Sequence, residues 1–381
     1  MDRKPASVWP LAIGGMIALA AAMGIGRFVY TPILPFMADA VPLNESQAGF
    51  IASANYLGYL LGALAGALGK LPGTKRMWFI SGLLLSAAVT ALMALTHSVA
   101  IFAALRLVGG IASAFVLVFS ASLVFDRLTL QGRQGLTPVL FAGVGFGIAA
   151  SAVLVALLAR SGADWRTMWQ WSAALTLVAT AFAAVLIPAA PDAGPSATGD
   201  SRKPDGRLTR LTLGYGLFGF GYVITATFIN TIVRAEPDLQ FLEDVIWLIV
   251  GLAGVPSVAF WAMVAKRTGP ARGVALACLA EALGVGLSVA STHPAAMILA
   301  AILLGGTFMG ITAIGLGHAR ALSRADPRRV VALMTAAFGV GQVAGPVFAG
   351  YAHRIGDSFL VPSLAAAAAL VVAAVLIESS R

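Results

Sequence analysis

Long apolar stretches alternate with short polar segments along the whole chain. Each stretch holds roughly 20 or more residues, the length that an α-helix needs to cross the hydrocarbon core of a bilayer. The stretches are too long, and alternate too little in polarity, to be strands of a membrane barrel. The pattern predicts an all-α membrane protein with twelve transmembrane helices, at 8–37, 46–69, 77–96, 98–125, 135–159, 167–188, 210–233, 244–265, 273–292, 295–319, 331–352 and 359–377.

One polar interruption is much longer than the others. Residues 189–209 are rich in Pro, Gly and Ser, a composition that is typical of a flexible linker. The interruption falls between the sixth and seventh predicted helices. We therefore predict an N-terminal six-helix bundle over 1–188, a linker over 189–209, and a C-terminal six-helix bundle over 210–381.

Glycine pairs recur in the two halves at a nearly constant spacing. The second copies follow the first by 195 or 196 residues and fall on helices of the same order in each half. Three matches in register indicate an internal repeat. Because six helices return the chain to the same side, the halves form parallel repeats about an axis along the membrane normal. The matching pairs are Gly24–Gly26 with Gly219–Gly221, Gly109–Gly110 with Gly305–Gly306, and Gly143–Gly145 with Gly339–Gly341.

The composition agrees with a membrane protein and excludes a soluble enzyme or a disordered chain. The chain is 59% apolar and 11% charged, with a mean hydropathy of +0.90, whereas a soluble domain carries roughly 25% charged residues. The net charge of +9 comes without a long basic run or a basic patch interleaved with aromatic residues. We therefore expect no nucleic-acid partner.

The basic residues favour one side of the membrane. With the N-terminus inside, 19 of the 25 basic residues lie in inner loops or tails, whereas the outer loops hold only Arg160, Arg166, Arg234 and Arg354. This bias follows the positive-inside rule and predicts that both termini are cytoplasmic. The seven tryptophans lie mostly near the ends of predicted spans, where we expect an interfacial belt.

Residues suited to covalent or metal chemistry are scarce. The single cysteine, Cys278, lies within an apolar run, and the four histidines are scattered without the spacing of a metal site. No nucleophile and base occur together in the predicted spans. We therefore expect no metal, no cofactor and no enzymatic activity.

Apart from charges at the ends of helices, three charged side chains fall within predicted spans: Arg27, Arg106 and Glu281. Burying an arginine costs at least ~2.5–3.5 kcal/mol on insertion scales, so such residues normally face a bundle interior or a water-filled cavity. Each arginine either binds a ligand or clamps backbone carbonyls, and Glu281 either carries a proton or pairs with another helix. The excess of positive charge favours an anion, which a guanidinium binds through paired hydrogen bonds.

Other polar residues accompany these charges. Tyr30 and Thr31 follow Arg27 by three and four residues and would share its helix face. We expect Pro32 and Pro35 to break the helix just beyond them. Each remaining polar candidate either contacts a ligand or makes a hydrogen bond between helices; these are Asn55, Tyr59, Tyr222, Asn230 and Gln342.

Several motifs resemble those of the major facilitator superfamily of secondary transporters. Residues 106–114 (RLVGGIASA) resemble its helix-four pattern R-x-x-x-G-x-x-x-A, and residues 24–35 and 53–59 resemble the bacterial YbfB/YjiJ-type branch. The loop after the second helix departs from the superfamily pattern, because Lys70 stands in place of an acid and Leu71 in place of an arginine. The fifth predicted helix lacks the proline of the antiporter motif, which weakens the case for a drug exporter.

The resemblance implies the major facilitator fold, in which helices one, four, seven and ten of the twelve line a central cavity. It assigns Arg27, Arg106 and Tyr222 to cavity-lining helices and places Glu281 in the outer scaffold. It assigns three further candidates to flanking helices: Asn55, Tyr59 and Gln342.

We predict a monomeric multi-pass carrier of the bacterial inner membrane that works by alternating access and moves a small organic anion. Arg27 is its expected principal ligand. Symport with protons would offset the membrane potential, which opposes anion entry by about 2.3 kcal/mol per charge per 100 mV. The alternative is a multidrug or metabolite efflux antiporter, which would normally hold cationic cargo with a carboxylate in the cavity.

Overall fold

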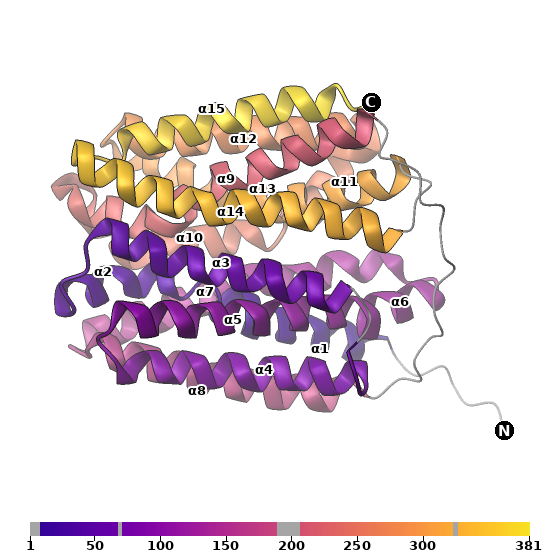
Figure 1. The fold of residues 1–381 in the computed structure, drawn as a ribbon, viewed down its shortest axis with the longest axis horizontal. Coiled ribbons are helices and arrows are strands. Elements are labelled where there is room, and N and C mark those ends of the chain that lie inside the picture. The colour runs from indigo at the N-terminus through magenta and orange to yellow at the C-terminus, as the bar shows by residue number, and fades with distance from the viewer. Residues whose placement is uncertain (1–7, 68–70, 189–205, 323–326) are drawn as a thin grey trace.

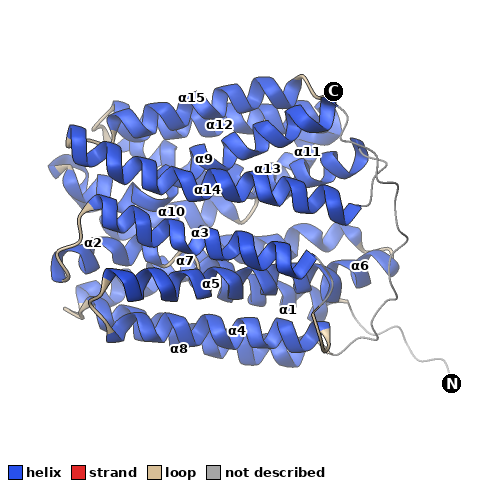
Figure 2. Ribbon diagram, viewed as in Figure 1, coloured by secondary structure: helices blue, strands red, loops and turns tan. Residues whose placement is uncertain are grey.

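The structure is a computed structural model that describes residues 8–67, 71–188, 206–322 and 327–381. Within these ranges it consists of helices and short connections and contains no strand (Figure 2). Eleven helices are long and apolar enough to cross a membrane, and the bent pair Pro237–Gly254 and Ser257–Thr268 is the twelfth when it is counted as one span. The prediction of an all-α protein with about twelve spans is confirmed.

The helices lie side by side along the long axis of the molecule and fall into two groups in chain order (Figure 1). The N-terminal half contains α1 (Trp9–Leu19), α2 (Tyr30–Ala40), α3 (Glu45–Ala67), α4 (Lys75–Leu92), α5 (Val99–Ser120), α6 (Asp126–Leu130), α7 (Thr137–Arg160) and α8 (Trp165–Leu186). The C-terminal half contains α9 (Gly206–Ala235), α10 (Glu243–Gly254), α11 (Ser257–Thr268), α12 (Pro270–Ala290), α13 (Pro294–Leu322), α14 (Pro327–Gly356) and α15 (Leu360–Glu378). Because α9 begins at Gly206, the last residues of the predicted linker belong to its first turn.

The first span is broken in the middle. After α1 the chain forms a π-helical segment, Ala20–Ile25, and residues 26–29 form a turn before α2 begins. At this turn the Thr31 N–H donates to the carbonyl of Phe28 instead of that of Arg27. The break therefore leaves the Arg27 carbonyl without its usual helical partner.

The position of this break corrects our expectation that Pro32 and Pro35 would end the helix. Both prolines lie within α2, which continues to Ala40. Pro32 occupies the first turn, where its missing N–H costs no helical hydrogen bond. The interruption instead occurs where helices pack very closely, since a Cβ at Gly24 would overlap Gly147 and one at Gly26 would overlap the Ser86 hydroxyl.

Close helix contacts repeat at the spacing of the sequence repeat. A Cβ at Gly110 would overlap the carbonyl oxygen of Asn55, and a Cβ at Gly305 would overlap that of Val250. Both members of the first contact lie 195 residues before those of the second, so Gly110 corresponds to Gly305, one residue from the Gly306 with which the glycine pairs matched it. The absence of a side chain at these glycines lets two helices approach backbone to backbone. The two halves therefore pack their second and fourth spans in the same way.

Equivalent positions of the two halves meet between α2 and α9. The Thr31 hydroxyl donates to the Ala226 carbonyl at 2.8 Å, and these residues are 195 positions apart. The ion pair of Asp39 and Arg234, with 2.6 Å between the atoms, joins residues that are also 195 positions apart. Contacts between equivalent residues occur at a two-fold axis, so the pseudo-symmetry axis of the molecule passes between these two helices.

Two helix pairs carry much of the contact between the halves: α3 with α14, and α7 with α10. Small residues bring the first pair together, since a Cβ at Gly49 would overlap the carbonyl of Pro346 and one at Gly350 would overlap that of Glu45. In the second pair Gly251 packs directly against the backbone of Ala149. At these glycines the two halves meet backbone to backbone.

Ion pairs between the halves gather at one end of the bundle. We call the end with the connection from α2 to α3 the Asp39 end, and the end where α9 begins and α15 ends the Arg381 end (Figure 1). In the part of the chain that the structure describes, the ion pairs that cross between the halves all lie at the Asp39 end. They are Arg234–Asp39 at 2.6 Å, Arg160–Asp244 at 2.9 Å and, when the imidazole is protonated, His353–Glu45 at 3.7 Å.

The backbone contact at Gly110 predicts a selective effect of added methyl groups. Gly110→Ala should lower the free energy of unfolding by about 1–3 kcal/mol, because the methyl group has no room against Asn55. Gly306→Ala is the matched control, since its Cβ would lie 4.0 Å from its nearest neighbour, the carbonyl oxygen of Ala253. Thermal unfolding of the purified variants measures both effects. Equal unfolding midpoints for Gly110→Ala and Gly306→Ala would contradict the close contact at Gly110.

Candidate functional site

A chain of polar side chains crosses from one half to the other in the middle of the bundle. Arg27 lies in the break of the first span and is 3% exposed. Its Nη2 donates to Oε1 of Gln342 on α14 at 2.8 Å, and the Gln342 amide donates in turn to the hydroxyl of Tyr222 on α9. The Nε of Arg27 has no hydrogen-bond partner among the described residues. The guanidinium is thus buried at the interface with unused donor capacity.

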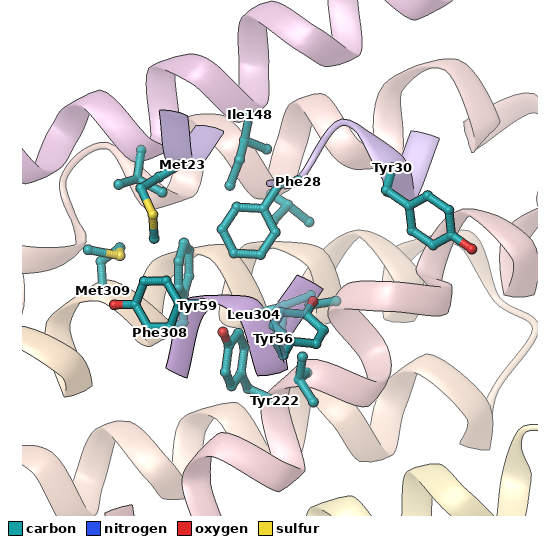
Figure 3. Close-up of a cluster of buried hydrophobic side chains, with 14 of the residues drawn as sticks. Met23, Phe28, Tyr30, Tyr56, Tyr59, Ile148, Tyr222, Leu304, Phe308 and Met309 are labelled. Carbon is teal, nitrogen blue, oxygen red and sulfur yellow. The ribbon is translucent and has the colours of Figure 1, made fainter. Parts of the chain in front are cut away.

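Aromatic rings surround the Arg27 guanidinium. Its central carbon lies 4.1 Å from the ring centre of Tyr59, 4.8 Å from that of Tyr56 and 5.5 Å from that of Phe28. Figure 3 shows these rings converging on one region, whereas Tyr30 points away from it. No ion pair with Arg27 occurs in the described parts of the chain, so its charge is stabilised by the faces of aromatic rings and by a neutral amide.

A narrow pocket lies beside this arginine. It has room for about one water molecule. Two of its lining residues, Phe28 and Ile148, come from the N-terminal half, and the others come from the C-terminal half. The complete lining is Phe28, Ile148, Tyr222, Ala226, Trp247, Val250, Leu304 and Phe308. Because both halves form its walls, the size of the pocket depends on their relative tilt.

Arg106 on α5 holds the break of the first span in place. Its Nη1 donates to the carbonyl of Gly26 at 2.9 Å, and its Nη2 donates to the carbonyl of Arg27 at 2.5 Å. The Asn55 amide donates to the carbonyl of Arg106 itself at 2.8 Å. Two of the three guanidinium nitrogens of Arg106 thus pair with the backbone at the break that carries Arg27, whereas its Nε, like that of Arg27, has no hydrogen-bond partner among the described residues.

Residues 19–378 match the family described as "Uncharacterised MFS-type transporter YbfB". The chain belongs to this family of major facilitator superfamily transporters. It is accordingly a secondary transporter and not an enzyme, and the resemblance seen in its motifs is confirmed. No curated protein matches the sequence.

Solved transporter structures share the fold. The crystal structure of a point mutant of the nucleoside transporter NupG has a TM-score of 0.78 and 16% identity, and the match covers 97% of this chain and 99% of that chain. A second crystal structure of NupG has a TM-score of 0.73 at 16% identity, covering 98% of each chain. At this identity the likeness establishes the fold of the transporter and leaves its cargo open.

The polar candidates of this transporter separate into two sets. Arg27, Tyr59, Tyr222 and Gln342 come together in one cluster at the interface of the halves. Four others make hydrogen bonds to backbone carbonyls: Tyr30 to Ala48 at 3.0 Å, Thr31 to Ala226 at 2.8 Å, Asn55 to Arg106 at 2.8 Å, and Asn230 to Glu243 at 3.3 Å.

Glu281 lies near the cluster but outside its hydrogen-bond chain. Its side chain is on α12 and fully buried, and neither carboxylate oxygen has a hydrogen-bond partner in the described ranges. It is close enough to the Tyr222 hydroxyl for an electrostatic interaction.

Most of the aromatic residues around Arg27 and the pocket could not be identified from the sequence. Phe28, Tyr56 and Phe308 carried no signal that separates a pocket residue from an ordinary core residue of a membrane helix. The expected interfacial belt was wrong for Trp247, which is 1% exposed and lines the pocket, and for Trp169, which is fully buried. Nearness to the end of a predicted span does not tell whether an indole faces lipid or a neighbouring helix.

The contacts of Arg106 predict a structural role that stability measurements can isolate. Arg106→Ala should lower the free energy of unfolding by about 2–4 kcal/mol, because two buried carbonyls lose charged donors. The exposed Arg354 provides the control, and Arg354→Ala should leave the unfolding midpoint unchanged. An Arg106→Ala protein of normal stability that no longer binds substrate would instead assign Arg106 to the ligand.

Proposed function

We propose that this transporter carries a small organic anion and that Arg27 binds its acidic group. The observation behind the proposal is a buried guanidinium at the interface of the halves that donates to a neutral amide and whose Nε is unpaired within the described residues. A charge-assisted hydrogen bond to a carboxylate is roughly twice as strong as one between neutral groups. An anion would therefore compete well with Gln342 for this guanidinium.

Binding at Arg27 would influence the arrangement of the halves. Gln342 and Tyr222 belong to the C-terminal half, whereas Arg27 belongs to the N-terminal half, so the hydrogen bond of Arg27 joins the two. An anion that displaces the Gln342 amide from Arg27 breaks this hydrogen bond between the halves and replaces it with its own contacts. A ligand shifts a conformational equilibrium only through such differential contacts.

Alternating access would require the contacts at the Asp39 end to break. In the described residues the crossing ion pairs close this end, while close backbone contacts such as Gly49 with Pro346 form a smooth surface on which the halves can tilt. The excess of basic residues in the loops of the Arg381 end supports a cytoplasmic position for that end in a bacterial inner membrane. The structure would then be the state that is closed to the outside.

Proton coupling is supported by the buried carboxylate of Glu281. Carboxylates buried among membrane helices are rare and often belong to proton relays in transporters. Tyr222 is within electrostatic range of this carboxylate, so a change of charge on Glu281 would be felt at the Gln342–Arg27 chain. A proton carried with the anion would offset the opposing membrane potential of about 2.3 kcal/mol per charge per 100 mV.

The anion proposal predicts that the shape of the guanidinium matters as well as its charge. Arg27→Lys should reduce organic-acid uptake at least tenfold, because an ammonium cannot form the paired hydrogen bonds of a guanidinium, and Arg27→Ala should abolish it. Arg166 is exposed near the start of α8 and serves as the control, so Arg166→Lys should transport normally. Vesicle uptake is the measurement, with protein abundance as a check, and unchanged uptake by Arg27→Ala would refute the proposal.

The coupling proposal predicts a change in pH dependence. Wild-type uptake of an organic acid should rise as the outside pH falls, because protonation of Glu281 accompanies entry. Glu281→Gln keeps the shape of the side chain and should make uptake independent of pH. The partly exposed Glu378 serves as the control, and Glu378→Gln should keep the wild-type profile. Identical pH profiles for Glu281→Gln and wild type would exclude this carboxylate from coupling.

A further inference from the structure

The pocket beside Arg27 has a chemical character that narrows the cargo. We propose that the transported anion is an aromatic carboxylate, with its ring in the pocket and its carboxylate on Arg27. This inference rests on the proposed anion function and goes further, because it assigns a ring site that the guanidinium alone does not require.

The lining of the pocket is poor in hydrogen-bonding groups. Among the described residues that form it, the side chains are aliphatic or aromatic, and only Tyr222 and Trp247 carry a polar atom. The Tyr222 hydroxyl already accepts the hydrogen bond of Gln342, and the Trp247 indole N–H, which has no partner among the described residues, is a single donor that could meet one polar atom of a cargo. A cargo with several hydroxyl groups or a second carboxylate would leave those groups unpaired here, which is strongly unfavourable in a buried site. The pocket therefore disfavours sugar acids, hydroxy acids and dicarboxylates.

Aromatic rings form the walls in several orientations. The ring of Phe28 meets that of Phe308 edge to face, with centres 6.2 Å apart and planes at 76°, and lies 6.4 Å from Trp247. The rings of Tyr222 and Phe308 are nearly parallel, with planes at 9° and centres 6.0 Å apart. Such walls offer both faces and edges to the ring of a ligand. Contacts between aromatic rings contribute binding free energy beyond that of apolar burial.

Two residues connect the ring site with the anion site. Phe28 follows Arg27 in the chain, and its ring lies 5.5 Å from the guanidinium carbon while also lining the pocket. Tyr222 lines the pocket with its ring and accepts from Gln342 through its hydroxyl. The polar and aromatic sites are therefore contiguous, as a carboxylate attached directly to a ring requires.

The halves must separate slightly for a ring to enter. The pocket is narrow here, and Phe28 faces wall residues of the opposite half across it. Tilting of the halves changes the distance between Phe28 and Phe308 and hence the width of the pocket. The ring would thus be admitted in one state and enclosed in the other.

The test compares ligands that differ only in the ring or in the charge. Binding of benzoate, cyclohexanecarboxylate, acetate and benzyl alcohol to the purified full chain is measured by titration calorimetry and by thermal stabilisation. We expect benzoate to bind about tenfold more tightly than cyclohexanecarboxylate, equal to about 1.4 kcal/mol. Acetate and benzyl alcohol should bind far more weakly, because each lacks one of the two groups that the site recognises.

Variants of one wall residue locate the ring. Phe308→Leu should weaken benzoate binding about tenfold and leave cyclohexanecarboxylate binding nearly unchanged, whereas Phe308→Tyr should keep the preference for benzoate. Phe348→Leu is the control, since this partly exposed ring packs against Phe220 outside the pocket. If Phe308→Leu does not fold, the ligand series on the wild-type protein still decides the question.

The outcomes separate this inference from the proposed function. Equal affinities for benzoate and cyclohexanecarboxylate, both lost in Arg27→Ala, would overturn the aromatic site and leave the anion function standing. Acid binding that survives in Arg27→Ala, or no binding of any acid, would overturn both. Uridine tests a neutral nucleoside, the class named for NupG, and uridine binding as tight as that of benzoate would also overturn the inference.

Discussion

The pairing of Arg106 with two backbone carbonyls is the interaction on which the centre of this transporter depends. A broken helix inside a membrane protein leaves carbonyls that neither water nor lipid can satisfy. The guanidinium of Arg106 presents two donors in a fixed plane, and these meet the carbonyls of Gly26 and Arg27. The break can therefore persist, and it turns Arg27 toward the interface of the halves. One buried arginine stabilises the geometry that displays the other.

The repeat explains why the polar chain lies where it does. Arg27 and Tyr222 occupy equivalent positions 195 residues apart, and equivalent residues of α2 and α9 meet at the pseudo-symmetry axis. Side chains from the two halves therefore converge at the centre, where Gln342 connects them. The backbone is nearly symmetric but the chemistry is not, because an arginine faces a tyrosine across the axis. A central site of this kind can hold one cargo between two similar halves.

Most of the fold could be predicted from the chain, whereas only part of the site could. Apolar spans, the long polar interruption and glycine pairs such as Gly109–Gly110 with Gly305–Gly306 indicated the number of helices and the repeat, because insertion into a bilayer and close helix contact limit which residues occur there. Arg27, Tyr222 and Gln342 stood out because polar groups are rare in such spans. Phe308 and Trp247 did not, since aromatic residues are common throughout membrane helices.

The amino-acid sequence by itself determined that the protein spans a membrane, how many times it crosses, and which few charges lie inside. These properties follow from local hydrophobicity, which each segment carries independently of its neighbours. The tertiary structure decided which groups each charge meets. In the sequence, Arg27 and Arg106 are alike as buried arginines. The packing of α5 against the broken first span pairs Arg106 with backbone carbonyls, whereas Arg27 lies beside a pocket. That distinction depends on distances between helices, which no local pattern encodes.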